Sequence, residues 1–213
     1  MAGFLDDPGI EAGRVAAVRA YLATAGGLAQ DAVELRVAAS VAHLGLAART
    51  LSPLYALAIL GRRLPAPVGL RDLRWQPAPG SMFALSLPDL AAAVPLRDRD
   101  TDAAAESDLE RVAVDLCEVT RPFGVSPRIL RGNVASALNG ARLALCAAQP
   151  GLAAPALAEL DRLLTRPLLA ETWQATPGGR FRRRSCCLIY RAAPDRRGPI
   201  CGDCVLAGGT RAA

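Results

Sequence analysis

The chain is organised around the stretch SCCLIYRAAPDRRGPICGDC, residues 185–204. It contains two adjacent cysteines, Cys186 and Cys187, then thirteen other residues, and then Cys201 and Cys204 in a Cys-x-x-Cys arrangement. Thiolates are the natural ligands of zinc and of iron–sulfur clusters, and a short loop brings such a set together at small entropic cost. The four cysteines therefore predict a metal site.

Three kinds of chemistry compete for these thiols. A disulfide between Cys186 and Cys187 would be strained, because neighbouring Cα atoms lie ~3.8 Å apart, below the usual disulfide range of roughly 4.4–6.8 Å. A structural zinc site commonly combines two spaced Cys-x-x-Cys chelates, whereas this chain offers one, and successive extended residues point to opposite faces. A [2Fe–2S] cluster spreads four thiolates over two irons and tolerates a less regular set. The spacing favours metal binding, with iron–sulfur only slightly ahead of zinc.

Positive charge is concentrated in the same part of the chain. Residues 180–213 carry eight arginines and two aspartates, a net charge of +6, whereas residues 1–179 have a net charge of −1. A basic surround stabilises thiolates and makes a cluster easier to reduce. The alternative is a basic patch for nucleic acid or a membrane surface. Only Phe181 and Tyr190 are aromatic in this segment, so no base-stacking platform is predicted and we expect no nucleic-acid partner.

Two stretches of the sequence resemble the FhuF-type ferric siderophore reductases. One is RRSCCLIYR, residues 183–191, followed by CGDCVL, residues 201–206; the other is RGNVASAL, residues 131–138, which is similar to the family's glycine–asparagine helix. The family's spacer between the two cysteine motifs is usually shorter than the thirteen residues found here. We interpret the extra length, around residues 194–199, as a longer turn rather than as lost ligands. The first half of the chain resembles the family only in general character.

The resemblance implies an enzyme, an oxidoreductase that transfers one electron to siderophore-bound Fe(III) and releases Fe(II). It also implies a [2Fe–2S] cofactor, and the residues expected to ligate it and to pass the electron are Cys186, Cys187, Cys201 and Cys204. Three arginines just before the cysteines are candidates for steering an anionic ferric complex or an acidic electron donor: Arg182, Arg183 and Arg184.

The partners expected on this basis are a ferric siderophore, with the hydroxamate type as one candidate, and an external electron donor such as a ferredoxin or a flavoprotein. An external donor is needed because no flavin or nicotinamide motif is present in the sequence. Two alternatives stay open. The same four cysteines would also suit a zinc-binding interaction module without turnover, or a redox sensor, although no DNA-binding helix pair supports the sensor.

The remainder of the sequence predicts a mainly α fold with a small β element. We divide the chain into an N-terminal helical part (1–61), a core with a small β element and helices (62–179), and a cluster-binding segment (180–213). Apolar periodicity, capping signals and proline positions give the expected helices, which are residues 10–25, 31–48, 53–61, 107–118, 128–147 and 155–173, the last broken at Pro167. Strands are expected at residues 73–76 and 81–85, and a hinge at residues 176–179.

The sequence also indicates the cellular compartment of the protein. No signal peptide is apparent at the N-terminus, and six cysteines in such a chain are typical of the reducing cytosol, so we expect a cytoplasmic protein. The most apolar window, residues 37–60, is interrupted by His43, Arg49 and Pro53, which argues against a membrane span and leaves at most peripheral contact. His43, Cys117 and Cys146 lie in apolar helical patterns, and we expect them to be core residues.

Overall fold

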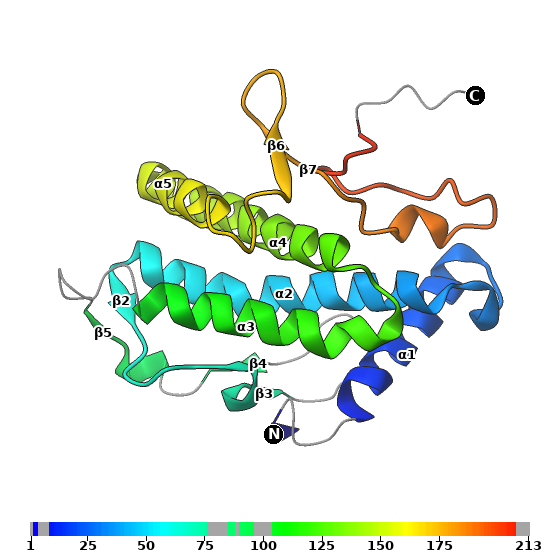
Figure 1. Ribbon diagram of the computed structural model, residues 1–213, viewed down its shortest axis with the longest axis horizontal. Helices are drawn as coiled ribbons and strands as arrows, with labels where there is room; N and C mark the ends of the chain where they lie inside the picture. Colours follow the sequence, from blue (N-terminus) through cyan, green and yellow to red (C-terminus); the bar gives the residue numbers. More distant parts are fainter. Residues whose placement is uncertain (1, 4–8, 76–84, 88–89, 96–103, 208–213) are drawn as a thin grey trace.

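The computed structural model of the protein describes residues 2–3, 9–75, 85–87, 90–95 and 104–207. Helices make up most of this part of the chain, with short strands beside them and an irregular C-terminal segment (Figure 1). The fold class is the one that the sequence predicts, mainly α with small β elements. The division into three segments stays a prediction.

The helices are α1 (Gly9–Gly26), α2 (Leu35–Ile59), α3 (Ala104–Thr120), α4 (Pro127–Ala148) and α5 (Ala153–Leu164). Helix α2 lies at the centre and packs against α1, α3 and α4, while α5 packs mainly on α4 (Figure 1). Helix α4 begins as its sequence predicts: Ser126 caps it by accepting a 3.4 Å hydrogen bond from the Ile129 N–H, and Pro127 takes the first helical position.

Helix α2 differs from the two helices expected in its place. The prediction of a break at Ser52–Pro53 was wrong, because Pro53 lies inside one continuous helix. An interior proline costs about 3 kcal/mol, but burial of a long apolar face against three neighbouring helices outweighs that cost. Ser52 Oγ donates to the Ala48 carbonyl at 2.5 Å instead of capping a new helix.

The start of α2 also differs from the prediction. Asp31 lies in a short 3-10 turn, Gln30–Ala32, and Glu34 occupies the N-cap position without a side-chain capping bond. The capping box that the spacing of Asp31 and Glu34 predicts is therefore not formed. Glu34 instead binds arginines, as described below.

The β structure is confined to short pairs of strands. Strand β3 (Arg74–Trp75) pairs antiparallel with β4 (Leu85–Ser86) and with β1 (Ala2–Gly3). The predicted strand pair is thus present, although residues 76–84, which include most of the second predicted strand, lie outside the described residues. A further pair joins β2 (Arg62–Arg63) to β5 (Val94–Pro95).

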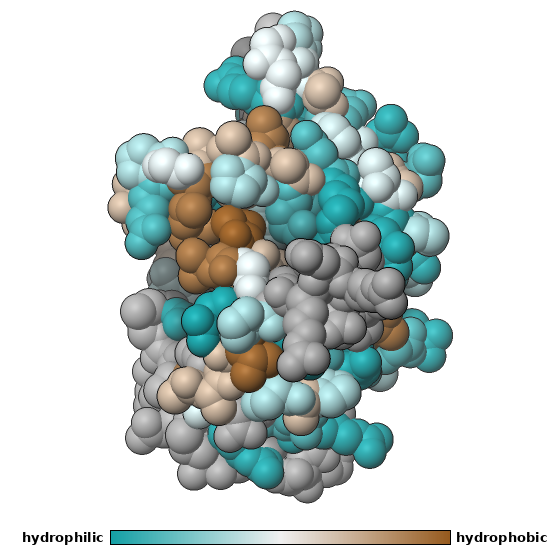
Figure 2. All heavy atoms as spheres, turned by 90° about the vertical axis from the view of Figure 1, so that its left-hand side faces the viewer, coloured by the Kyte–Doolittle hydropathy of each residue, from teal (hydrophilic) through white to brown (hydrophobic). Residues whose placement is uncertain are grey.

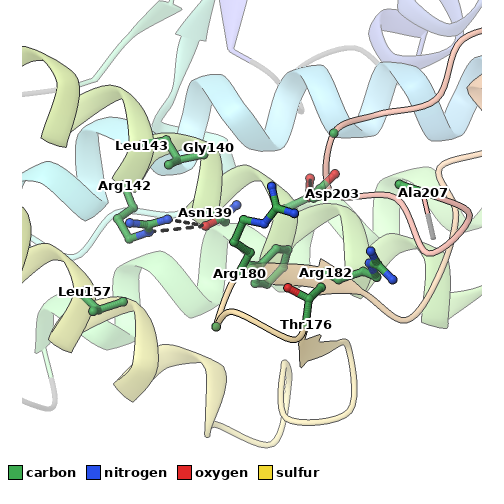
Figure 3. Close-up of a pocket in the computed structure, with 14 residues that line it drawn as sticks. Asn139, Gly140, Arg142, Leu143, Leu157, Thr176, Arg180, Arg182, Asp203 and Ala207 are labelled. Atoms are coloured by element: carbon green, nitrogen blue, oxygen red, sulfur yellow. Dashed lines mark hydrogen bonds between the residues drawn. The ribbon is translucent and has the colours of Figure 1, made fainter.

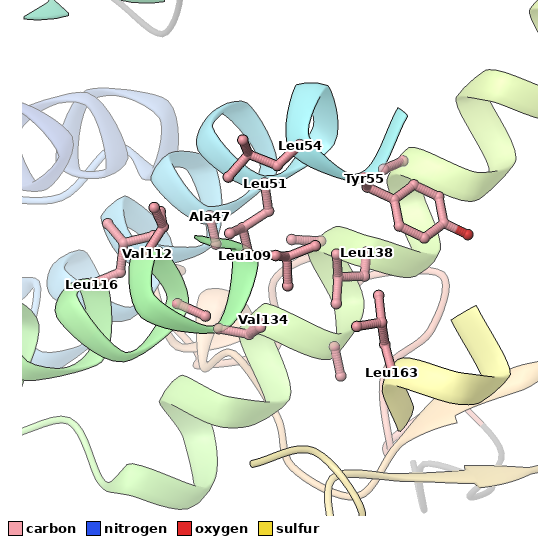
Figure 4. Packing of buried hydrophobic residues seen from close by; sticks show 14 of the residues in the cluster. Ala47, Leu51, Leu54, Tyr55, Leu109, Val112, Leu116, Val134, Leu138 and Leu163 are labelled. Carbon is pink, nitrogen blue, oxygen red and sulfur yellow. The ribbon is translucent and has the colours of Figure 1, made fainter. Parts of the chain in front are cut away.

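Two hydrophobic clusters form the core. The larger lies between α2, α3, α4 and α5 (Figure 4), and Tyr55 at its edge donates a hydrogen bond to the Ala156 carbonyl of α5. The smaller lies between α1, the first half of α2 and the start of α4, and three residues from the C-terminal segment pack against it: Leu188, Ile189 and Ala192. The C-terminal segment is therefore attached to the same core as the helices.

The outer surface is mixed in character. Figure 2 shows that hydrophobic side chains gather on the end of the molecule that lies to the left in Figure 1, with hydrophilic side chains around them. In the described part of the chain, we find no helix whose length and apolar character would let it cross a bilayer.

Candidate metal centre

A β-hairpin leads the chain from α5 toward the cysteines. Strands β6 (Trp173–Ala175) and β7 (Phe181–Arg183) pair antiparallel, and the rings of Trp173 and Phe181 stack with centroids 6.0 Å apart. The glycine-rich residues 176–179, predicted as a hinge, belong to the turn of this hairpin. Sequence reasoning missed the hairpin, although Pro-Gly-Gly between two aromatic residues was a usable signal for it.

The four cysteines of the C-terminal segment come together in two close pairs. The sulfurs of Cys187 and Cys201 are 3.0 Å apart, and those of Cys186 and Cys204 are 3.6 Å apart. Each pair takes one cysteine from each sequence motif. Cys187 and Cys204 are buried, whereas Cys186 and Cys201 are half-buried, and all four are free thiols.

Backbone N–H groups point at these sulfurs. Leu188 N–H donates to Cys186 Sγ at 3.3 Å, and Leu206 N–H donates to Cys204 Sγ at 3.5 Å. Leu188 has a positive φ of 71°, and the chain turns there into the short 3-10 helix Ile189–Arg191. In both bonds the donor is the residue two positions after the cysteine. Such bonds stabilise thiolates and tune a cluster's potential.

Arg183 is a fully buried cation at the centre of the site. Its exposed fraction is 0%, and its Nη2 donates to Cys201 Sγ at 3.2 Å while Nη1 donates to Asn133 Oδ1 at 2.8 Å. Nε lies 3.5 Å from Asp203 Oδ1, as an ion pair. Burial by itself lowers the pKa of Arg183, but Asp203 and the neighbouring thiols raise it above the ordinary value. Asn133 in turn donates to the carbonyl and hydroxyl of Ser40 on α2, at 3.0 and 3.2 Å.

One face of α4 receives the cysteine segment. Gly132 lies so close to Ser185 that a Cβ on the glycine would come within 2.2 Å of the serine hydroxyl. Asn133 binds Arg183 from the next position, and Ser136 Oγ, one turn further on, donates to Asp203 Oδ2 at 2.5 Å. The glycine–asparagine helix singled out in the sequence is thus the surface against which the cysteine segment is held.

The thiols influence one another's protonation. Hydrogen bonds from Cys186 and Cys201 hold the pKa of Cys187 far below its ordinary value, and Arg183 lowers it further. The same bonds raise the pKa values of Cys186 and Cys201.

The spacer between the cysteine motifs is anchored to the N-terminal helices. Arg191 forms an ion pair with Glu34 at 2.6 Å, and the Ala192 carbonyl packs so tightly on Gly26 that a Cβ there would come within 2.4 Å of it. Residues 194–197 form an exposed turn. The extra length is a longer turn, as expected.

The three arginines before the cysteines lie in different surroundings. Arg183 is buried against the thiols, whereas Arg184 is exposed and pairs with Glu171 at 3.3 Å. Arg182, half-buried, borders a surface pocket. Only Arg182 and Arg184 are thus placed to meet an incoming molecule.

The other candidate residues lie away from this centre. His43 is fully buried, and burial lowers its pKa to about 4, so it is neutral near pH 7. Its Nε2 lies 3.9 Å from the sulfur of Cys117. Cys117 and Cys146 are half-buried rather than buried, and burial raises the pKa of Cys117 to about 11. His43 is a core residue, as expected, and Cys117 packs against both core clusters, whereas Cys146 belongs to neither cluster.

Comparison with known proteins agrees with this arrangement. Residues 183–206 match the family model described as the FhuF 2Fe-2S C-terminal domain, and this range holds all four cysteines of the centre together with Arg183. No curated protein and no solved structure matches the chain significantly. The C-terminal segment is thus a FhuF-type [2Fe–2S] domain.

The residues present fit such a cofactor. Four thiols without disulfides supply the donor set. Backbone N–H groups and one buried guanidinium face the sulfurs, and these donors offset negative charge.

Proposed function

We propose that this chain, whose C-terminal segment is a FhuF-type [2Fe–2S] domain, is a ferric siderophore reductase. Siderophore oxygens are hard ligands that hold Fe(III) much better than Fe(II), so the addition of one electron releases the metal. A bound [2Fe–2S] cluster supplies single electrons, which is the stoichiometry that this step requires. The observation that carries the proposal is the set of four paired thiols around Arg183 within the matched segment.

Different residues of the chain have different roles in holding the cofactor. Cys186, Cys187, Cys201 and Cys204 hold the cofactor. The N–H groups of Leu188 and Leu206 fix the sulfurs of two of them, and Arg183 brings a permanent positive charge next to a third. A cation beside the sulfurs favours the more negative, reduced form of the centre.

Other molecules complete the reaction. An external donor, a ferredoxin or a flavoprotein, supplies the electron, because the sequence has no motif for a flavin or a nicotinamide. We place the reaction in the cytoplasm, where free thiols such as the six found here persist. Arg182 and Arg184 attract a negatively charged partner toward the centre, whereas Arg183 is buried and cannot contact it.

Replacement of one ligand tests the proposal. We expect Cys201→Ser, purified without oxygen, to lose both the brown colour and the ability to reduce a ferric siderophore. In the assay dithionite is the electron donor, and a chelator that becomes coloured when it binds Fe(II) reports the released iron. Cys146→Ser is the matched control, since this half-buried thiol lies on α4 outside the centre, and it should keep both properties.

Two outcomes would contradict the proposal. A colourless Cys201→Ser variant with full activity would show that reduction does not depend on the centre. A coloured wild-type protein that reduces no ferric siderophore under the same conditions would leave an iron–sulfur protein with a different activity.

A further inference from the structure

A surface pocket adjoins the cysteine loop. Its volume is about 770 Å³, within the range of about 300–1,000 Å³ typical of small-molecule sites. Helix α4, helix α5, the hairpin turn and the loop residues Gly202 and Asp203 form its walls (Figure 3). Because Gly202 and Asp203 lie between Cys201 and Cys204, one wall of the pocket is the segment that holds the thiols.

The pocket is positively charged. Three arginines and one aspartate line it, a net charge of +2: Arg142, Arg180, Arg182 and Asp203. The negative charge of Asp203 is already engaged, since its carboxylate pairs with the buried Arg183 and accepts a hydrogen bond from Ser136. Within the described residues, Arg180 and Arg182 have no side-chain hydrogen bond or ion pair. Both guanidinium groups are therefore available to a ligand in the pocket.

The same pocket has an apolar side. Leu143 on α4 and Leu157 on α5 border it and are 53% and 48% exposed, which is high for leucine (Figure 3). Phe181 also lines it and is held in place by stacking on Trp173. Apolar walls with a few fixed charged groups suit an organic ligand that also carries negative charge.

We propose that this pocket binds the ferric chelate in the reductase reaction and that it selects chelates with a net negative charge. That the ligand is a ferric chelate rests on the proposed function, whereas its negative charge is inferred from the arginines of the pocket. Three hydroxamate groups, each −1, give a neutral complex with Fe(III), whereas three catecholate groups, each −2, give a complex of charge −3. The arginines attract only the second kind.

Charge and position together favour a small chelate over the protein donor as the occupant. The pocket is a hollow of ligand size, with apolar walls and the cysteine loop as its inner boundary. A chelate seated there lies against Gly202 and Asp203, directly beside two of the four cysteines in the chain. An acidic protein would instead need an extended basic surface.

Binding of redox-inert gallium(III) complexes tests the inference without electron transfer. The oxidised, cluster-loaded protein is titrated calorimetrically with gallium(III) bound to a hexadentate tris-catechol chelator, charge −3, and to a hexadentate tris-hydroxamate chelator of neutral charge. We expect the anionic complex to bind at least about tenfold more tightly, with an affinity that falls as salt is raised.

Charge reversal in the pocket supplies the second arm. The double variant Arg180→Glu/Arg182→Glu should lose the preference for the anionic complex and bind it at least about tenfold more weakly. Arg71→Glu makes the same type of charge change at an exposed arginine in the short turn Leu70–Asp72 and should bind like the wild type. An unchanged visible spectrum in all variants shows that the cluster is retained.

Each other outcome is decisive. Equal affinity for the neutral complex, or wild-type affinity in the double variant, overturns the inference. So does a double variant that binds the chelate normally but accepts electrons more slowly from an acidic ferredoxin, because the pocket would then receive the donor. If the anionic complex binds as expected but its iron(III) counterpart is not reduced, the pocket stands and the proposed reductase function fails.

Discussion

At the scale of single residues, the buried arginine distinguishes this centre from a simple set of four thiols. Arg183 has no contact with solvent, yet its charge is satisfied on three sides by Asn133, Asp203 and Cys201. A buried charge without partners would be too costly to keep, so these partners are required for its presence. The guanidinium is therefore a fixed part of the electrostatic environment of the sulfurs.

Removal of this charge should make the cluster harder to reduce. We expect Arg183→Gln to lower the midpoint potential of the cluster by on the order of 100 mV. A unit charge about 4 Å away at intermediate dielectric changes the energy of the reduced cluster by several times the amount that corresponds to 59 mV, and relaxation of the surrounding protein reduces this shift. Potentiometric titration followed by visible spectroscopy measures it. Arg182→Gln, at a half-buried neighbour without a bond to sulfur, should shift the potential far less. Equal shifts in both variants would refute a special role for Arg183.

The residues of the centre were only partly predictable from the sequence. The spacing of the cysteines identified all four members of the pairs, because thiolate ligands have few other uses at such density. The buried role of Arg183 was not predictable, since three consecutive arginines look alike until β7 turns one of them inward. Its partner Asn133 lies fifty positions away, on a different element.

At the scale of elements, α4 is the platform on which the cysteine segment rests. Residues 132, 133 and 136 face that segment, and Gly132 is required by the close approach of Ser185, whose hydroxyl also donates to the Arg128 carbonyl at 3.2 Å. Glycine within a helix costs about 1 kcal/mol relative to alanine, so its presence in the middle of α4 needs such a reason.

Alanine substitutions at two glycines of α4 should therefore have opposite effects. We expect Gly132→Ala to lower the free energy of unfolding by about 1 kcal/mol or more, because Ser185 must give up its hydrogen bond to make room for the methyl group. Gly140→Ala, where a Cβ meets nothing within 4 Å, should raise it by up to about 1 kcal/mol. Urea unfolding followed by circular dichroism measures both.

A double-mutant cycle identifies the cause. In Gly132→Ala/Ser185→Ala the obstruction is gone, so the double variant should be more stable than the sum of the single effects predicts. Additive effects, or a stabilising Gly132→Ala, would show that the contact between the glycine and the serine does not constrain α4.

The elements themselves were predicted with uneven success, for physical reasons. The starts and ends of α1 and α4 and the end of α3 followed from local signals. Pro53 did not end α2, because tertiary burial outweighed a local preference that the sequence shows clearly. The hairpin β6–β7 was missed because each of its strands is only three residues long, which is too short for an alternating pattern to stand out.

At the scale of the whole molecule, the C-terminal segment is fixed at two separate places. The hairpin and the cysteine loop lie on α4, whereas the spacer reaches the start of α2 through Arg191 and Glu34 (Figure 1). Leu188 and Ile189 add apolar contacts with the smaller core cluster. The spacer therefore also serves to attach the segment, which cysteine spacing alone does not reveal.

The central claim is that the C-terminal cysteines hold a [2Fe–2S] cluster, and metal analysis tests it most directly. We expect protein isolated without oxygen to contain two irons and two acid-labile sulfides per chain, and no zinc. One zinc per chain with neither iron nor sulfide would contradict the claim.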